Sequence, residues 1–206
     1  MHMLDQSSLA RIMFPVGGID KTEVRQIAAD RSLRTAFKPD SQDVCFITST
    51  GGREAFLGDR IPVRPAQVID TSGSVVGEVP AVELVTIGQR RGIGLPGGGP
   101  KRYVVDVDHA SSTVVVGSDA EMRSDSARAT SPTWVDQPVS GEVLVQMSAH
   151  GATVPAVIEP DDTGVAIDWH EPQRRVAPGQ SIVFYDLADR CVLGGATAVR
   201  SAVAHG

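Results

Sequence analysis

The sequence predicts a mainly β protein with a short α-helical segment at its N-terminal end. Five short apolar runs between residues 139 and 199 are separated by turn residues, which is typical of a small antiparallel barrel or sandwich. Earlier in the chain, pairs of apolar runs flank polar turns at residues 70–73 and 109–112. Apolar residues recur at helical spacing only near the N-terminal end. We therefore expect helices first and strands through the rest of the chain.

Two short helices are expected in the first part of the chain. Residues 9–13 carry apolar side chains at helical spacing before Pro15 ends the first helix. Asp20 is suited to cap a second helix, because its carboxylate accepts free amide hydrogens, and Glu23 completes a capping box. This second helix should end near Arg31. Two helices cannot bury both of their faces, so this segment needs something to pack on.

The strands are expected from apolar runs between turn residues. Residues 44–47 form a short apolar run, which predicts a buried strand. Residues 103–108 and 113–117 form the clearest hairpin, whereas the polar residues 118–130 predict a linker or a domain boundary. The five C-terminal runs are residues 139–147, 154–158, 165–169, 182–185 and 191–199.

Length and composition exclude several classes of protein. A length of 206 residues allows one large or two small domains, and an apolar content of 41% is enough for a packed core. Two cysteines cannot support a secreted disulfide scaffold, and no apolar run or signal-peptide pattern predicts a membrane span or secretion. A cytoplasmic location is expected. The net charge of −6 argues against a generally basic nucleic-acid binder but leaves room for a local basic face.

Cys45 is the leading candidate for chemistry, and the residues around it leave two interpretations open. In the first, Cys45 is a buried small hydrophobic residue, because both of its neighbours are apolar. In the second, Cys45 is a reactive thiol at the point where a polar loop meets a strand. Lys38 favours the thiolate, whereas Asp40 and Asp43 oppose it. Cys191 is expected in a strand core without a functional role.

Two glycine-rich stretches bear on phosphate binding. Residues 88–94 include Arg90 and Arg91 and are able to cradle a phosphate, but their Gly-x-Gly is not a full dinucleotide fingerprint. Residues 97–99 are most simply a flexible turn. The chain contains neither a Walker A sequence nor a Ser-Gly-Gly-x-Asp-Ser pyrophosphate loop, and its His and Cys residues lack metal-ligand spacing. No nucleotide cofactor or metal is therefore expected in this chain.

Five short segments follow one another along the chain. They are Phe14-Pro15-Val16-Gly17, Lys38-Pro39-Asp40-Ser41-Gln42, Cys45-Phe46-Ile47, Thr86-Ile87-Gly88-Gln89-Arg90-Arg91-Gly92 and Pro178-Gly179-Gln180. In this order they resemble the tRNA-specific 2-thiouridylase family across nearly the whole chain. The resemblance implies residues 1–47 as a remnant of the catalytic, adenine nucleotide alpha hydrolase-like domain. It implies residues 48–119 as a central β-rich domain and residues 120–206 as an antiparallel barrel like elongation-factor domain 2.

The resemblance also implies a reaction and its residues. Enzymes of this family thiolate C2 of the wobble uridine of tRNA, which they first activate with ATP and magnesium. Cys45 matches the cysteine that carries the sulfur as a persulfide. Ser148 and Ala149 stand where many members have a basic tRNA-contacting stretch, so the salt-dependent part of RNA binding should be weakened. Gln180 matches a tRNA-contacting glutamine, although its segment is equally a plain β-turn.

Arg90 and Arg91 belong to the segment of residues 86–92 that carries part of the resemblance. They have two interpretations: they steer RNA into the site, or they are solvated surface charges. The expected partners are tRNA, a cysteine desulfurase or sulfur-relay donor and a separately encoded ATPase polypeptide, with no membrane. The family's ATP-binding loop matches nothing in the chain, so the chain alone should be inactive. The alternative functions are a non-catalytic RNA-binding β module and a partner subunit of a pyrophosphate-loop ATPase.

Overall fold

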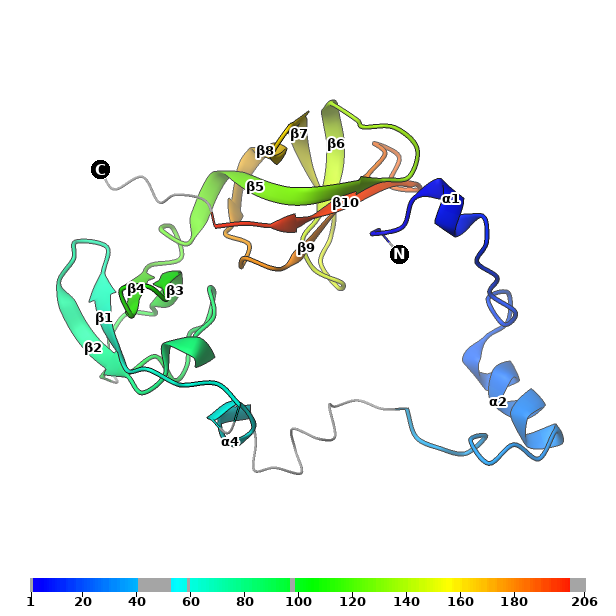
Figure 1. Ribbon diagram of the computed structural model, residues 1–206, viewed down its shortest axis with the longest axis horizontal. Helices are drawn as coiled ribbons and strands as arrows, with labels where there is room; N and C mark the ends of the chain where they lie inside the picture. Colours follow the sequence, from blue (N-terminus) through cyan, green and yellow to red (C-terminus); the bar gives the residue numbers. More distant parts are fainter. Residues whose placement is uncertain (1, 41–52, 59, 97–98, 201–206) are drawn as a thin grey trace. The chain divides into compact units, whose positions relative to one another are not determined.

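The computed structural model describes residues 2–40, 53–58, 60–96 and 99–200, and it divides the chain into two compact units (Figure 1). One unit comprises Met1–Gln6 with Val63–Gly206, and the other comprises Ser7–Pro62. The first unit holds every described strand, and the helices lie in or next to the second. The predicted fold class, mainly β with a short helical N-terminal part and an antiparallel barrel, is confirmed.

The described helices are short. They are α1 (Gln6–Leu9), α2 (Lys21–Asp30) and α4 (Arg53–Gly58). Asp20 caps α2 as expected, because its Oδ1 accepts the Glu23 amide hydrogen at 2.9 Å, and the helix ends within one residue of the predicted end. No helix among the described residues is both long and apolar enough to span a membrane.

The predicted first helix over residues 9–13 is wrong in its position. Helix α1 already ends at Leu9, and the next residues form isolated turns, in which the Ile12 amide donates to the Leu9 carbonyl. The side chain of Met13 is 82% exposed. Most helical stability in proteins comes from packing an apolar face, so apolar spacing without a packing partner does not sustain a helix here.

The central part of the first unit is a four-stranded sheet with the order β2-β1-β4-β3. Its strands are β1 (Ala66–Asp70), β2 (Val75–Val79), β3 (Tyr103–Asp108) and β4 (Thr113–Gly117), and a 3-10 helix, η1 (Val82–Leu84), follows β2. Both predicted hairpins form as antiparallel pairs, and β1 joins them by pairing in parallel with β4. The fully buried Val68, Val104 and Val114 belong to the core of this sheet.

The C-terminal part is a closed six-stranded barrel with the order β10-β5-β8-β7-β6-β9 (Figure 1). Its strands are β5 (Arg123–Trp134), β6 (Gly141–Gln146), β7 (Val154–Asp161), β8 (Gly164–Arg174), β9 (Ser181–Tyr185) and β10 (Val192–Ala198). Alternate residues point inward, so Ile182 and Phe184 are fully buried while Val183 between them is only partly buried. The Phe184 ring stacks on Trp134, with ring centroids 5.5 Å apart.

Two predictions for this region are wrong. Residues 118–130 were expected to form a linker or a domain boundary, and the linker is wrong because strand β5 occupies most of this range, although only Ala129 of its residues is buried. The strand exists because it pairs with β8 on one side and with β10 on the other, which closes the barrel independently of its apolar content. Cys191 was expected in a strand core, but it is exposed and precedes β10.

Candidate functional site

A pocket of about 670 Å³ on the barrel brings together three positions that the sequence singled out. Ser148 and Ala149 line it from the loop after β6, and Gln180 lines it from the turn before β9. All three residues are exposed. Residues that are distant in the sequence thus form one continuous surface.

The turn that carries Gln180 is held in place by backbone hydrogen bonds. The Gln180 amide donates to the Ala177 carbonyl at 3.1 Å, which closes the predicted turn. Gly179 has φ +86°, a conformation that side chains rarely adopt, so glycine suits this position. The Gly179 amide donates to the Ala198 carbonyl at 2.9 Å, and the Ala198 amide donates to the Gln180 carbonyl at 2.8 Å. Strand β10 therefore fixes the backbone position of Gln180.

The opposite wall of the pocket depends on two residues that sequence reasoning did not single out. The Tyr185 hydroxyl donates to Gln146 Oε1 at 3.0 Å, and Gln146 Nε2 donates to the Gly151 carbonyl at 2.8 Å. The Gly151 amide then donates to the Ser148 carbonyl at 3.0 Å. This relay holds the loop that carries Ser148. No motif in the sequence pointed to the contact of Tyr185 with Gln146.

The barrel pocket is electrically neutral. The described residues that line it include no Lys, Arg, Asp or Glu. Its only histidine is His2, and burial, followed by the positive N-terminus, lowers the pKa of His2 below its ordinary value of 6.5. His2 is therefore uncharged at neutral pH. A pocket of this kind suits the uncharged parts of a nucleic acid, such as a base edge or a ribose hydroxyl.

Arg90 and Arg91 lie elsewhere in the same unit. Their loop is anchored to β3, because the Gly88 amide donates to the Val104 carbonyl at 2.8 Å and the Val104 amide donates to the Gln89 carbonyl at 2.9 Å. Both arginines are exposed, and neither lines the barrel pocket. Arg90 lines a second pocket of about 350 Å³, and Arg91 does not.

Gly94, which follows these arginines, and Gly77 in β2 serve backbone packing. A Cβ on Gly94 would lie 1.9 Å from the carbonyl oxygen of Glu78, and a Cβ on Gly77 would lie 2.4 Å from the carbonyl oxygen of Gly94. Both positions allow the loop to approach β2 more closely than any side chain would permit. Gly94 also has φ +67°. The close approach explains this glycine without invoking a bound phosphate.

Cys45 lies outside the described residues. In the described segment before it, the carboxylate of Asp40 forms ion pairs with two cations. Asp40 Oδ1 lies 3.2 Å from both the Lys21 ammonium and the Arg25 guanidinium, and these partners, Lys21 foremost, lower the pKa of Asp40. The Arg25 guanidinium also donates to the Lys38 carbonyl at 3.1 Å, which folds this segment back onto α2. The charge of Asp40 is thus compensated by two cations.

The residues that the structure describes do not fit ATP with magnesium. No group of three or more His, Cys, Asp or Glu among them is placed to hold a metal ion. Gly94 in the glycine-rich loop approaches the Glu78 backbone of β2 closely, and this contact explains that glycine. We therefore assign no nucleotide or metal site to the described part of the chain.

Three family models match the chain in sequence order. The tRNA methyl transferase HUP domain matches residues 1–49, the tRNA methyl transferase PRC-barrel domain matches residues 54–118, and the aminomethyltransferase beta-barrel domain matches residues 124–198. The three matched ranges follow one another along nearly the whole chain.

Several curated proteins named tRNA-specific 2-thiouridylase MnmA are similar to the chain. The protein from Rhodococcus jostii is 44% identical over 96% of this chain and 56% of its own length. The protein from a Roseiflexus species is 41% identical over 97% of this chain and 54% of its own length. The protein from Acidothermus cellulolyticus is 42% identical over 98% of this chain and 56% of its own length. The chain thus spans about half the length of the curated relatives it matches.

Proposed function

The chain belongs to the tRNA-specific 2-thiouridylase family, and from this premise we propose that it acts in the 2-thiolation of the wobble uridine of tRNA. Its role is that of the sulfur-accepting and tRNA-binding part of the enzyme, in the cytoplasm. The observation that most supports this role is the barrel pocket, in which Gln180 meets the neighbouring residues Ser148 and Ala149 although it is distant from them in the sequence. The family resemblance had assigned all three to tRNA contact on separate grounds.

Cys45 is the proposed sulfur carrier. A cysteine desulfurase or a sulfur-relay protein presents a persulfide, and the Cys45 thiolate attacks its outer sulfur. One S–S bond forms on Cys45 while the donor's S–S bond breaks and its thiolate leaves, so no external oxidant is needed. The match of residues 1–49 to a HUP domain model supports this role, since that range contains Cys45. ATP with magnesium activates the uridine in the complete enzyme, through residues outside the described part of this chain.

RNA contact divides into an uncharged part and a charged part. The barrel pocket offers the Gln180 amide, the Ser148 hydroxyl and the Tyr185 ring, which suit hydrogen bonding to and packing against nucleosides. Arg90 and Arg91 on the central sheet supply cations for phosphates. Since no described residue that lines the barrel pocket is a cation, affinity should be weak, and its decrease with rising salt should come from cations outside this pocket, such as Arg90 and Arg91.

Sulfur loading tests the proposal directly. The chain is incubated with a cysteine desulfurase and cysteine, and intact-mass analysis should show one added sulfur atom. Cys45→Ser should add none, whereas Cys191→Ser should still add one. Cys191 is the matched control, because its thiol is exposed and would accept sulfur in a non-specific reaction. Sulfur that persists on Cys45→Ser rejects the persulfide role.

Thiolation of tRNA tests the division of labour. The isolated chain with ATP, a desulfurase and tRNA should produce no thiouridine, and adding a separately encoded pyrophosphate-loop polypeptide should restore the product. Thiouridine formed without such a partner would contradict this assignment.

A second function is favoured by one observation: the described residues that line both pockets all belong to the unit of residues 1–6 and 63–206, whereas Cys45 belongs to the unit of residues 7–62. That function is a non-catalytic RNA-binding β module. It predicts tRNA binding that Gln180→Ala weakens, without any sulfur on Cys45.

A further inference from the structure

Three cations converge on the second pocket, in the central sheet. Arg90, Lys101 and Arg102 line it together with the backbone of the Gly92–Pro96 loop. We propose that this pocket binds a phosphate of the RNA backbone and forms a second tRNA contact besides the barrel pocket; this inference rests on the proposed function. It adds Lys101 and Arg102, which sequence reasoning did not single out, and gives Arg90 a defined place.

Backbone pairing explains why the three cations meet. The hydrogen bonds of Gly88 and Gln89 with Val104 place the loop that carries Arg90 beside the start of β3, directly after Lys101 and Arg102. The Gln89 side chain closes this loop, because its Nε2 donates to the Arg91 carbonyl at 2.8 Å. The positions of Arg90 and Arg102 are therefore set by main-chain contacts.

The charge of the pocket is left largely unbalanced. No carboxylate is among the residues that line it. Arg90 and Lys101 are exposed, and the described residues provide neither of them with an ion pair. Arg102 has a weak partner, since its Nη1 lies 3.9 Å from Asp70 Oδ2. Two free cations and one loosely held guanidinium thus share a concave surface in a chain whose net charge is −6.

A phosphodiester is the ligand that fits this chemistry. A guanidinium presents paired N–H donors that match two oxygens of one phosphate, and a lysine ammonium adds a mobile point charge. A site of about 350 Å³ with exposed cations at its rim suits one phosphate of a longer backbone, which enters and leaves over the surface. The barrel pocket, with no cation in its lining, complements it by receiving uncharged parts of the same RNA.

The salt dependence of tRNA binding tests this inference. The full chain and the variant R90A/K101A/R102A are titrated with a fluorescently labelled tRNA transcript between about 50 and 200 mM KCl. Each lost phosphate contact should reduce the slope of log K against log salt by about 0.7–0.9. The pair variant R90A/K101A removes only exposed side chains, which guards against misfolding of the triple variant. Arg34→Ala is the control for the loss of an arginine outside the pocket and should keep the wild-type slope, since Arg34 is exposed and belongs to the other unit.

The outcomes separate this inference from the proposed function. An unchanged slope in both pocket variants, with binding still weakened by Gln180→Ala, overturns the phosphate pocket and leaves the proposed function standing. Absence of tRNA binding by the wild-type chain overturns the proposed function and, with it, the RNA ligand of this pocket. Amide spectra recorded during titration with inorganic phosphate add a further criterion. Shifts at Gly92 and Gly94 without any change in the tRNA slope mean a free-anion site, which also overturns the inference.

Discussion

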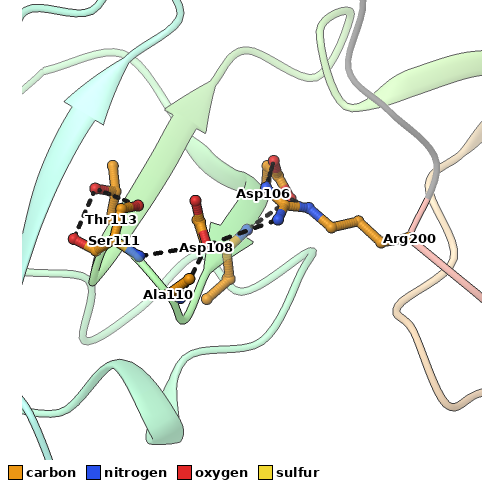
Figure 2. A network of polar contacts seen from close by, with 7 residues as sticks. Asp106, Asp108, Ala110, Ser111, Thr113 and Arg200 are labelled. Carbon is orange, nitrogen blue, oxygen red and sulfur yellow. Dashed lines mark hydrogen bonds and ion pairs between the residues drawn. The ribbon is translucent and has the colours of Figure 1, made fainter.

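Replacing Arg200 with alanine should loosen the attachment of the barrel to the central sheet. Arg200 follows β10, and its guanidinium binds the buried Asp106 of β3 with Nη2–Oδ2 and Nε–Oδ1 distances of 2.6 and 3.2 Å (Figure 2). Its Nη1 also lies 3.7 Å from Asp108 Oδ1. The hydrogen bond to Asp106 raises the pKa of Arg200 above its ordinary value. A bidentate ion pair thus joins two parts of one unit.

The expected loss of stability depends on the contacts that Asp106 retains in the variant. In Arg200→Ala the Asp106 carboxylate keeps the hydrogen bond from the Val107 amide at 2.9 Å. Breaking a fully buried ion pair costs about 3–5 kcal/mol, whereas a hydrogen bond to a charged group contributes about 1.5–3 kcal/mol. The Arg200 side chain is 48% exposed, so water replaces part of the contact and the lower range applies. We therefore expect a loss of about 1.5–3 kcal/mol.

Urea unfolding followed by tryptophan fluorescence measures this loss, because both tryptophans, Trp134 and Trp169, lie in barrel strands. A double-mutant cycle with Asp106→Asn isolates the pair, and we expect a coupling free energy of at least about 0.5 kcal/mol. Arg190→Ala, which removes an exposed arginine from the same unit, should stay within about 0.5 kcal/mol of wild type. A loss below about 0.5 kcal/mol in Arg200→Ala, or a cycle without coupling, would refute the reasoning.

Three further predictions concern other contacts. Gly94→Ala should destabilise the chain by at least about 2 kcal/mol in urea unfolding, because its Cβ meets the Glu78 carbonyl oxygen and its φ is left-handed; near-wild-type stability would contradict the packing role. Hydrogen bonds, chiefly from the Ser118 hydroxyl, lower the pKa of Glu121 from 4.5 to about 2. The Glu121 carboxylate therefore stabilises the fold above pH 4.5, and this stabilisation is lost as the pH falls toward 2. The difference in free energy of unfolding between the wild type and Glu121→Gln should shrink over that range, and a difference that does not change with pH would contradict this prediction. Tyr185→Phe frees the Ser148 loop and should weaken tRNA binding while costing only about 0.5–1.5 kcal/mol of stability, and unchanged tRNA affinity would remove Tyr185 from the site.

The barrel shows which parts of the fold are readable from the sequence. Strands β6, β7 and β9 bury apolar residues at alternate positions, and this local pattern predicts them. Strand β5 carries mostly polar residues and is defined by its pairing with β8 and β10, which are far away in the chain. A local sequence pattern carries no information about pairing between distant strands, so the strand that closes the barrel was interpreted as a linker.

The same distinction applies to the candidate sites. Gln180 and Ser148 were identified through short segments that resemble the family, and the structure brings them to one pocket. Tyr185 and Lys101 escaped notice because their roles come from tertiary contacts. Tyr185 acts through Gln146, which lies on the neighbouring strand β6, and Lys101 meets Arg90 only because their segments pair at Val104. Neither contact has a signature in local sequence.

The net charge of −6 is compatible with RNA binding because of where the acidic groups act. Hydrogen bonds lower the pKa of several carboxylates. Asp70, Asp108, Glu121 and Asp186 accept them from nearby backbone amides or hydroxyls in turns, whereas the pKa of Asp161 is lowered first by the Arg128 guanidinium and then by Thr163. None of these five lines the barrel pocket or the pocket with three cations. At physiological salt the field of an exposed charge decays over about 8 Å, so an RNA phosphate responds mainly to the groups beside it. Acidic side chains that stabilise turns, together with Arg90 and Lys101, which the described residues leave without an ion pair at one pocket, therefore let an acidic chain present a local cationic surface.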